Sequence, residues 1–178
     1  VYTGRYSKEK SHAVLIDAAA LSRHSADIQL VFAGSGPLLE ALQKRARKLA
    51  VPPVFSFFDR AQMPALLNGA DLYVHPAEIE AEGIGCLEAI SCGLTAVISD
   101  SPRCATKAYA LDERDLFRFD SPRDLAARID YWIEHPAQRA AQGRRYAAYA
   151  KGKFDRDACM DRMEAMLLET SRNGGRRR

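Results

Sequence analysis

The sequence lacks several features that would assign it at once to a functional class. It has no run of eighteen apolar residues and no charged segment followed by an apolar stretch at its start, so we expect neither a membrane span nor a signal peptide. Its four cysteines form no C-x-x-C pair and show no metal-ligand spacing, which is typical of a reducing cytosol. No G-x-G-x-x-G follows the first predicted strand, which disfavours an NAD-dependent protein.

A surface of one charge sign is also missing. The formal net charge is +3, but four arginines follow the last predicted helix, and without them the chain would carry a net charge of −1. A nucleic-acid-binding face is therefore not expected. We expect residues 1–170 to form one domain and residues 171–178 to form a basic, disordered tail. An alternative is that the arginines touch acidic lipid.

The composition is that of an ordinary globular chain. Hydrophobic residues make up 47% and charged residues 28% of the 178 positions, and this length allows one domain with a substantial core. Because Val1 lies inside a predicted strand, we expect the chain to be part of a longer protein.

Short apolar runs alternate with helical patterns along the chain. The apolar runs predict strands at residues 1–3, 28–33, 54–57, 71–75, 95–99 and 116–119. Helical spacing and capping residues predict helices near residues 11–21, 37–49, 60–68, 87–90, 121–135, 137–150 and 155–170. In the last helix we expect core packing by Met160, Met163, Met166 and Leu167. The alternation predicts an α/β fold, a Rossmann-like parallel sheet of about six strands with helices on both faces.

The candidate site is organised around residues 70–93. In this stretch an apolar strand is followed by a polar loop with three glutamates, by a glycine turn and by a helix. A strand, a glycine turn and a helix together direct free backbone N–H groups toward an anion. Glu80 lies before the turn and Glu88 after it, and carboxylates accept hydrogen bonds from hydroxyls. The stretch therefore predicts a ligand with hydroxyls on both sides of its phosphates, as in a nucleoside diphosphate sugar.

Two other interpretations of this stretch are open. Charged loops of this kind commonly cap a helix near its positive end without binding a ligand. Glu78, Glu80 and Glu82 also suggest a cation site, but alternate residues of an extended loop point to opposite sides, which argues against a metal.

Three polar loops follow predicted strands, at residues 4–10, 34–37 and 75–85. In parallel sheets covered by helices, ligands bind beyond the carboxyl ends of the strands. We therefore expect the three loops to meet at one edge of the sheet and to form the site.

Three motifs occur in these loops with a defined order and spacing. They are the G-R-x-x-x-E-K-x-H segment at residues 4–12, the G-x-G-P loop at residues 34–37 and the E-x7-E pair of Glu80 and Glu88. In this order the motifs resemble the C-terminal half of retaining glycosyltransferases with the GT-B fold, the family-4 group. The resemblance extends over nearly the whole chain.

The resemblance implies a donor site for a nucleoside diphosphate sugar. Arg5 and Lys10 would hold the diphosphate, and Glu88 would accept hydrogen bonds from the ribose. Glu80 would contact the sugar hydroxyls and stabilise charge at the anomeric carbon, which makes Glu80 and Glu88 the expected catalytic pair. Further donor-binding positions would be Gly34, Gly36, Gly83, Ile84 and Gly85.

The resemblance also implies the setting of the reaction. The activity would be retaining hexosyl transfer to a hydroxyl of a lipid, a glycan or another acceptor, without a cofactor or a metal. The acceptor would bind mainly to an N-terminal half that this chain does not hold, so we expect the chain alone to be inactive. The implied location is the bacterial cytoplasm, including its membrane face, where the full-length protein would associate peripherally.

Two positions depart from the family pattern. Glu82 stands where the family usually has Phe, which affects contacts near the sugar, and Ser56 replaces a glycine of the third strand, which affects how the base sits. Two alternative functions are kept open. One is a sugar-nucleotide epimerase of GT-B-like fold, and the other is a non-catalytic nucleotide-binding module.

Overall fold

The computed structural model describes residues 1–174. Its six strands are β1 (Tyr2–Thr3), β2 (Val31–Ala33), β3 (Val54–Ser56), β4 (Tyr73–His75), β5 (Ala96–Ser99) and β6 (Leu116–Phe117). Its helices are α1 (His12–Leu21), α2 (Leu39–Ala46), α3 (Met63–Asn68), α4 (Ile84–Ser91), α5 (Pro122–Glu134), α6 (Pro136–Phe154) and α7 (Arg156–Gly174). Three short 3-10 helices are η1 (Lys8–Lys10), η2 (Ala105–Tyr109) and η3 (Glu113–Asp115).

Hydrogen bonds between the first strand segment and β4 join two parallel ladders, β1-β2-β3 and β4-β5-β6, into one sheet. The amino group of Val1 donates to the carbonyl oxygen of Leu72 (2.8 Å), and the N–H of Val74 donates to the carbonyl oxygen of Val1 (3.0 Å). The strand order is therefore β3-β2-β1-β4-β5-β6. In this doubly wound arrangement the winding reverses between β1 and β4, which is where such sheets form their binding crevice.

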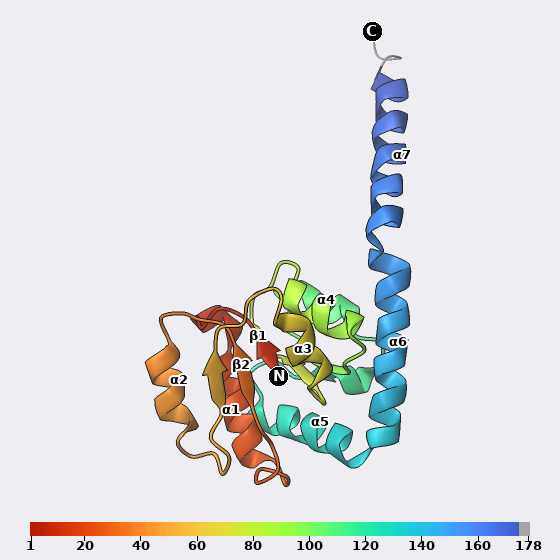
Figure 1. The fold of residues 1–178 in the computed structure, drawn as a ribbon. Helices are drawn as coiled ribbons and strands as arrows, with labels where there is room; N and C mark the ends of the chain where they lie inside the picture. Colours follow the sequence, from red (N-terminus) through yellow and green to blue (C-terminus); the bar gives the residue numbers. More distant parts are fainter. Residues whose placement is uncertain (175–178) are drawn as a thin grey trace.

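Helices cover both faces of the sheet (Figure 1). Helix α1 packs against α2 and α5, whereas α4 packs against α6. Every residue of β4 and β5 is buried, as expected for parallel strands covered on both sides. The predicted α/β fold is confirmed.

Strand β2 begins later than the sequence predicts, at Val31 instead of residue 28. Its partner in the ladder is β3, in which Val54 pairs with Val31. Pro52 and Pro53 precede Val54 and have no backbone N–H, so the β2–β3 ladder is not extended in that direction.

The two predicted helix caps have different outcomes. Ser121 caps α5 as predicted, since its hydroxyl oxygen accepts a hydrogen bond from the N–H of Asp124 (3.3 Å). Ser11 does lie at the N-cap position of α1, but its backbone is left-handed (φ 51°) and its side chain forms no capping hydrogen bond. The left-handed turn instead links η1 directly to α1.

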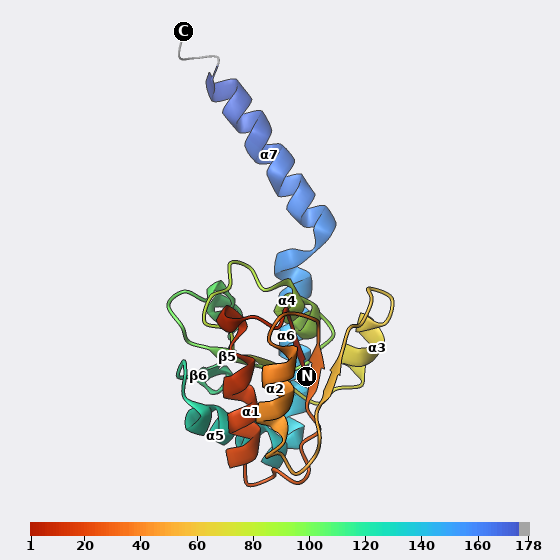
Figure 2. The same cartoon turned by 90° about the vertical axis from the view of Figure 1, so that its left-hand side faces the viewer.

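The last helix, α7, extends away from the domain (Figures 1 and 2). The prediction that its large apolar side chains pack in the core is wrong, because the exposed residues include Met160, Met163, Met166 and Leu167. Their spacing indicates an apolar helix face, but spacing does not determine whether this domain covers that face. Helix α7 continues past the expected domain end at residue 170, and the remainder of the expected tail, residues 175–178, lies outside the described residues. Neither α7 nor any other helix within residues 1–174 combines the length and apolarity of a membrane span.

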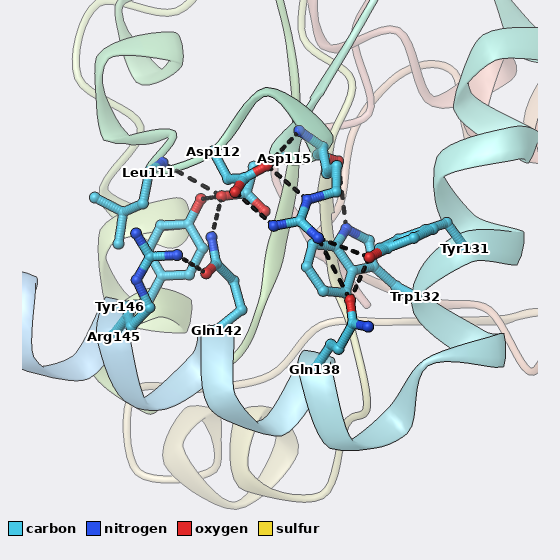
Figure 3. A network of polar contacts seen from close by, with 10 residues as sticks. Leu111, Asp112, Asp115, Tyr131, Trp132, Gln138, Gln142, Arg145 and Tyr146 are labelled. Atoms are coloured by element: carbon cyan, nitrogen blue, oxygen red, sulfur yellow. Dashed lines mark hydrogen bonds and ion pairs between the residues drawn. The ribbon is translucent and has the colours of Figure 1, made fainter.

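A buried carboxyl group ties η3, and with it the start of β6, to α6 (Figure 3). The side chain of Asp115 accepts hydrogen bonds from the Tyr146 hydroxyl (2.9 Å), the Gln142 amide (2.5 Å) and the N–H of Leu111 (3.3 Å). Burial raises the pKa of Asp115, although these donors act in the opposite direction. The network anchors the β6 side of the sheet and contributes no residue to the pocket described next.

Candidate functional site

A pocket of about 660 Å³ opens at the carboxyl ends of the first three strands. Its walls are the loops after these strands, the start of α3 and the first two turns of α4. The lining residues are Thr3, Gly4, Arg5, Ala33, Gly34, Ser35, Gly36, Phe57, Phe58, Met63, Gly85 and Glu88. A second pocket, of about 440 Å³, lies at the opposite edge of the sheet and includes residues 27–31 and 69–72.

Backbone hydrogen bonds hold the first two loops together at the larger pocket. The N–H of Gly4 donates to the carbonyl oxygen of Ala33 (3.0 Å), and the N–H of Tyr6 donates to that of Ser35 (2.8 Å). The second loop is tied to β3 in the same way, by a bond from the N–H of Gly34 to the carbonyl oxygen of Ser56 (2.8 Å). The wall is therefore built from backbone, and it extends the pairing of the sheet beyond the strand ends.

Five of the residues that the sequence predicts for the site line this pocket: Arg5, Gly34, Gly36, Gly85 and Glu88. The side chains of Arg5 and Glu88 are exposed, and neither has an ion-pair partner within residues 1–174. A cation and a carboxylate thus face solvent in the same pocket, and both are available to a ligand.

Lys10 and Glu80 do not line the pocket but form an ion pair of their own. The Lys10 Nζ atom lies 2.5 Å from Glu80 Oε2, and only 20% and 16% of the two side chains are exposed. The backbone of Glu80 is fixed on both sides, because its N–H donates to the carbonyl oxygen of Arg103 (3.1 Å) and its carbonyl oxygen accepts from Ala105 (2.8 Å). The N–H of Glu78 donates to the carbonyl oxygen of Glu9 (2.8 Å), which brings the glutamate loop against the loop of Lys10.

Gly83 forms the turn between these two groups of residues. Its backbone is left-handed (φ 70°, ψ 55°), and a Cβ atom there would lie 2.0 Å from Thr106 Cγ2 and 3.2 Å from Glu80 Cγ. Glycine is therefore required both by conformation and by space. Gly83 and Ile84 lie outside the pocket lining, and 60% of the Ile84 side chain is exposed.

Gly85 brings the start of α4 against the end of β1. A Cβ atom at Gly85 would lie 2.0 Å from Thr3 Oγ1, so only a glycine permits this approach. Within the described residues, no carbonyl or side chain accepts a hydrogen bond from the N–H groups of Ile84 and Gly85. These two donors are free at the positive end of the helix, beside the pocket.

His75, at the end of β4, was not among the predicted site residues. It is 2% exposed, and its Nε2 atom lies 3.6 Å from Glu80 Oε2. Burial lowers the pKa of His75 to about 4, so the ring is neutral near pH 7. Its place as the last residue of an apolar strand, five residues before Glu80, was the available signal.

An apolar wall of the pocket was also not predicted. Phe57, Phe58 and Met63 lie at and after the end of β3, and 70% of the Phe57 side chain is exposed. An exposed aromatic ring at the carboxyl end of a strand is the feature that would have indicated it. The pocket thus has an apolar side and a polar side.

Within residues 1–174, no three His, Cys, Asp or Glu side chains are grouped so that they could hold a metal ion. The expectation that the reaction requires no metal stays a prediction.

Comparison with curated proteins finds bacterial sugar transferases. Over 100 residues the chain is 39% identical to a GDP-mannose-dependent alpha-(1-6)-phosphatidylinositol dimannoside mannosyltransferase of Mycobacterium tuberculosis, which covers 56% of this chain and 26% of the relative. Over 145 residues it is 30% identical to the putative glycosyltransferase EpsF of Bacillus subtilis, which covers 80% of this chain and 36% of the relative. The matched segments thus span between about a quarter and just over a third of the length of these relatives.

Solved structures show the same architecture. The catalytic domain of cholesterol-alpha-glucosyltransferase from Helicobacter pylori superposes with a TM-score of 0.82 at 42% identity, covering 85% of this chain and 96% of that chain. The Anabaena protein Alr3699/HepE in complex with UDP superposes with a TM-score of 0.79 at 22% identity, covering 95% of this chain and 48% of that chain, and this likeness concerns the fold alone.

The family assignment follows from the sequence of the domain. The model of the family described as glycosyl transferases group 1 matches residues 1–151, which include all six strands and the whole candidate site. The resemblance that the motifs indicated is therefore confirmed, and the chain belongs to the glycosyl transferases group 1 family, with the GT-B fold.

Proposed function

We propose that this chain is the donor-binding part of a retaining glycosyltransferase that moves a hexose from a nucleoside diphosphate sugar to an acceptor hydroxyl. The observation that carries the proposal is the pocket at the reversal point of the sheet. Arg5 and Glu88, which have no ion-pair partner within residues 1–174, line this pocket together with Gly85, and the free N–H groups at the start of α4 lie beside it. The names of two of the similar proteins specify GDP-mannose and UDP, which are nucleoside diphosphate ligands.

The two sides of the pocket suit the parts of such a donor. The exposed ring of Phe57 and the neighbouring Phe58 and Met63 offer an apolar surface to the base. Glu88 accepts hydrogen bonds from the ribose hydroxyls, and the N–H groups of Ile84 and Gly85 donate hydrogen bonds to phosphate or sugar oxygens.

The diphosphate and the sugar lie toward the ion pair of Lys10 and Glu80. Arg5 binds the diphosphate at once, whereas Lys10 must first exchange the Glu80 carboxylate for a phosphate oxygen. Glu80 is then available to the sugar hydroxyls and to the positive charge that develops at the anomeric carbon. As the bond from that carbon to the phosphate breaks, the leaving diphosphate gains negative charge, and the two cations stabilise it.

The acceptor belongs to the part of the protein outside this chain. We propose a second, N-terminal domain that binds the acceptor and closes over the donor, because closure excludes water and positions the acceptor hydroxyl. Two similar proteins are named for lipid acceptors, a phosphatidylinositol dimannoside and cholesterol, so we include a lipid among the acceptor classes. A lipid acceptor would place the full-length protein at the inner face of a membrane.

Calorimetric titration of the 178-residue chain with UDP, GDP, UDP-glucose and GDP-mannose tests the proposal. We expect one of the two nucleotide pairs to bind with a dissociation constant on the order of millimolar to tens of micromolar. Glu88→Gln should weaken this binding, whereas Glu113→Gln, which makes the same charge change at an exposed position outside the pocket, should not. Absence of binding by all four ligands would refute the proposal.

Product analysis separates the alternative enzyme class. A sugar-nucleotide epimerase would isomerise or hydrolyse the nucleotide sugar without any acceptor, which phosphorus and proton NMR detect directly. We expect no such product from this chain.

A further inference from the structure

Glu80 has two neighbours at the same carboxylate oxygen. Lys10 Nζ lies 2.5 Å from Glu80 Oε2, and His75 Nε2 approaches this atom from the strand side at 3.6 Å. Lys10 and Glu80 thus form a close ion pair, whereas the distance from His75 to Glu80 is slightly too long for a hydrogen bond.

The imidazole of His75 forms no hydrogen bond within the described residues. The residue is 2% exposed. A buried polar nitrogen without a partner is unfavourable, so a stable fold retains one only where something else compensates for it. The nearby carboxylate of Glu80 is the acceptor that a small movement would supply.

The histidine ring is fixed, and the glutamate side chain is the part that can move. The ring of His75 packs edge-on against Tyr2 (5.6 Å between centroids, 89°) and nearly parallel to Tyr73 (6.2 Å, 22°). A Cβ atom at Gly83 would lie 3.5 Å from His75 Cε1 and 3.2 Å from Glu80 Cγ, so Gly83 lies next to both side chains and leaves no room there for a larger residue. The main chain of Glu80 is held by Arg103 and Ala105, which leaves rotation of its side chain as the available motion.

Donor binding removes the partner that Glu80 has in this structure. A diphosphate carries more negative charge than one carboxylate, so it competes for Lys10 Nζ. When Lys10 turns to the diphosphate, Glu80 keeps its charge and its partly buried position and needs another donor.

We infer that His75 is a positioning residue, which donates its Nε2–H to Glu80 once the donor diphosphate has drawn Lys10 away and thereby holds the carboxylate toward the sugar. This inference rests on the proposed function. It explains why a neutral imidazole with a single N–H is buried behind a charged side chain. It also makes the sugar contact depend on prior binding of the diphosphate.

Calorimetry with paired ligands tests the inference. His75→Leu keeps an apolar side chain in the buried site but removes the donor, whereas His75→Gln keeps an N–H group. We expect His75→Leu to change the affinity for UDP and GDP less than about twofold and to weaken the binding of UDP-glucose or GDP-mannose by about tenfold. His75→Gln should restore most of that loss. Rescue by Gln is an outcome that a purely structural role of His75 would not produce.

His12 provides the matched control. It is also 2% exposed and without a hydrogen-bond partner for its ring nitrogens within the described residues, and it too packs against Tyr2 (4.7 Å between centroids). His12→Leu therefore perturbs the same aromatic cluster without removing a neighbour of Glu80, and we expect equal changes for both members of each ligand pair.

The outcomes separate this inference from the proposed function. Binding of no nucleotide by the wild-type chain would overturn both. Binding by the wild type with equal losses for diphosphate and sugar conjugate in His75→Leu, or with no loss, would overturn only the role of His75. Nitrogen-15 NMR of the wild-type imidazoles gives a second measurement if the Leu variant does not fold: UDP or GDP should shift the Nε2 resonance of His75 and leave that of His12 in place. An unmoved His75 resonance with bound nucleotide would contradict the inference.

Discussion

The two buried histidines predict that the fold is sensitive to acid. His12 and His75 are each 2% exposed, and burial lowers the pKa of each ring from 6.5 to about 4. In the unfolded chain both rings bind a proton near pH 6.5, whereas in the folded chain they bind it only near pH 4. Between these values the unfolded state holds more protons, so the free energy of unfolding decreases as the pH falls.

The size of the effect follows from the difference between the two pKa values. The shift from 6.5 to about 4 corresponds to about 3 kcal/mol for each histidine. This stability is fully present above pH 6.5 and is lost by pH 4. Together the two histidines account for about 6 kcal/mol, which is a large part of the roughly 5–15 kcal/mol that stabilises an ordinary domain. We therefore expect the wild-type chain to become much less stable as the pH falls from 6.5 to 4.

Urea unfolding at intervals between pH 7.5 and pH 4 measures the effect. His12→Leu and His75→Leu should each lower the free energy of unfolding at pH 7.5, but each should flatten its pH dependence by about 3 kcal/mol relative to the wild type. Asp115, whose pKa burial raises, changes stability in the opposite direction, and it contributes equally to wild type and variants, so the difference isolates the histidine. An identical pH dependence in wild type and variants would show that the two buried histidines do not cause the loss of stability in acid.

Three further predictions concern the site itself. Glu88→Ala should lower the affinity for both the nucleoside diphosphate and its sugar conjugate by about tenfold in calorimetry. Glu80→Ala should leave the affinity for the diphosphate unchanged and lower the affinity for the sugar conjugate. Equal effects of each variant on both ligands would contradict the assigned roles. Arg5→Ala should reduce the affinity for UDP or GDP by about tenfold and leave that for uridine or guanosine unchanged, and an equal loss for the nucleoside would make Arg5 structural. Gly85→Ala should destabilise the fold by about 1–3 kcal/mol in thermal unfolding, because its Cβ atom would lie 2.0 Å from Thr3 Oγ1. Gly152→Ala should not destabilise it, because its Cβ atom would meet no atom of another part of the described chain within 4 Å. If a Thr3→Ala background failed to relieve the loss in Gly85→Ala, the contact with Thr3 would not be its cause.

The parallel α/β fold and the meeting of two of the site loops could be predicted because they depend on local sequence patterns. Alternating apolar runs and helical patterns fix a parallel sheet, and parallel pairing brings the loops at 4–10 and 34–37 to one edge. The glycine at position 83 is likewise visible in the sequence, since the turn before a helix favours a residue that readily adopts a left-handed backbone, whereas the need for Gly85 comes from its contact with Thr3.

Contacts between segments distant in sequence could not be predicted. The pairing of Lys10 with Glu80 joins residues that lie seventy positions apart, and both side chains had plausible ligands of their own. The place of His75 behind Glu80 depends on the packing of three aromatic rings. Helix α7 shows the same limit, because the periodicity of Met160 and Met163 reports an apolar face and does not report what surrounds it.

We expect a nucleoside diphosphate sugar to bind at the carboxyl edge of this sheet. Titrating the isotope-labelled chain with UDP-glucose and GDP-mannose while recording amide chemical shifts tests it directly. We predict shifts for one of the two ligands, concentrated at residues 4–10, 34–36 and 80–88 and including Ile84 and Gly85. Shifts at the opposite edge instead, around residues 27–31 and 69–72, or no shifts with either ligand at millimolar concentration, would contradict the account.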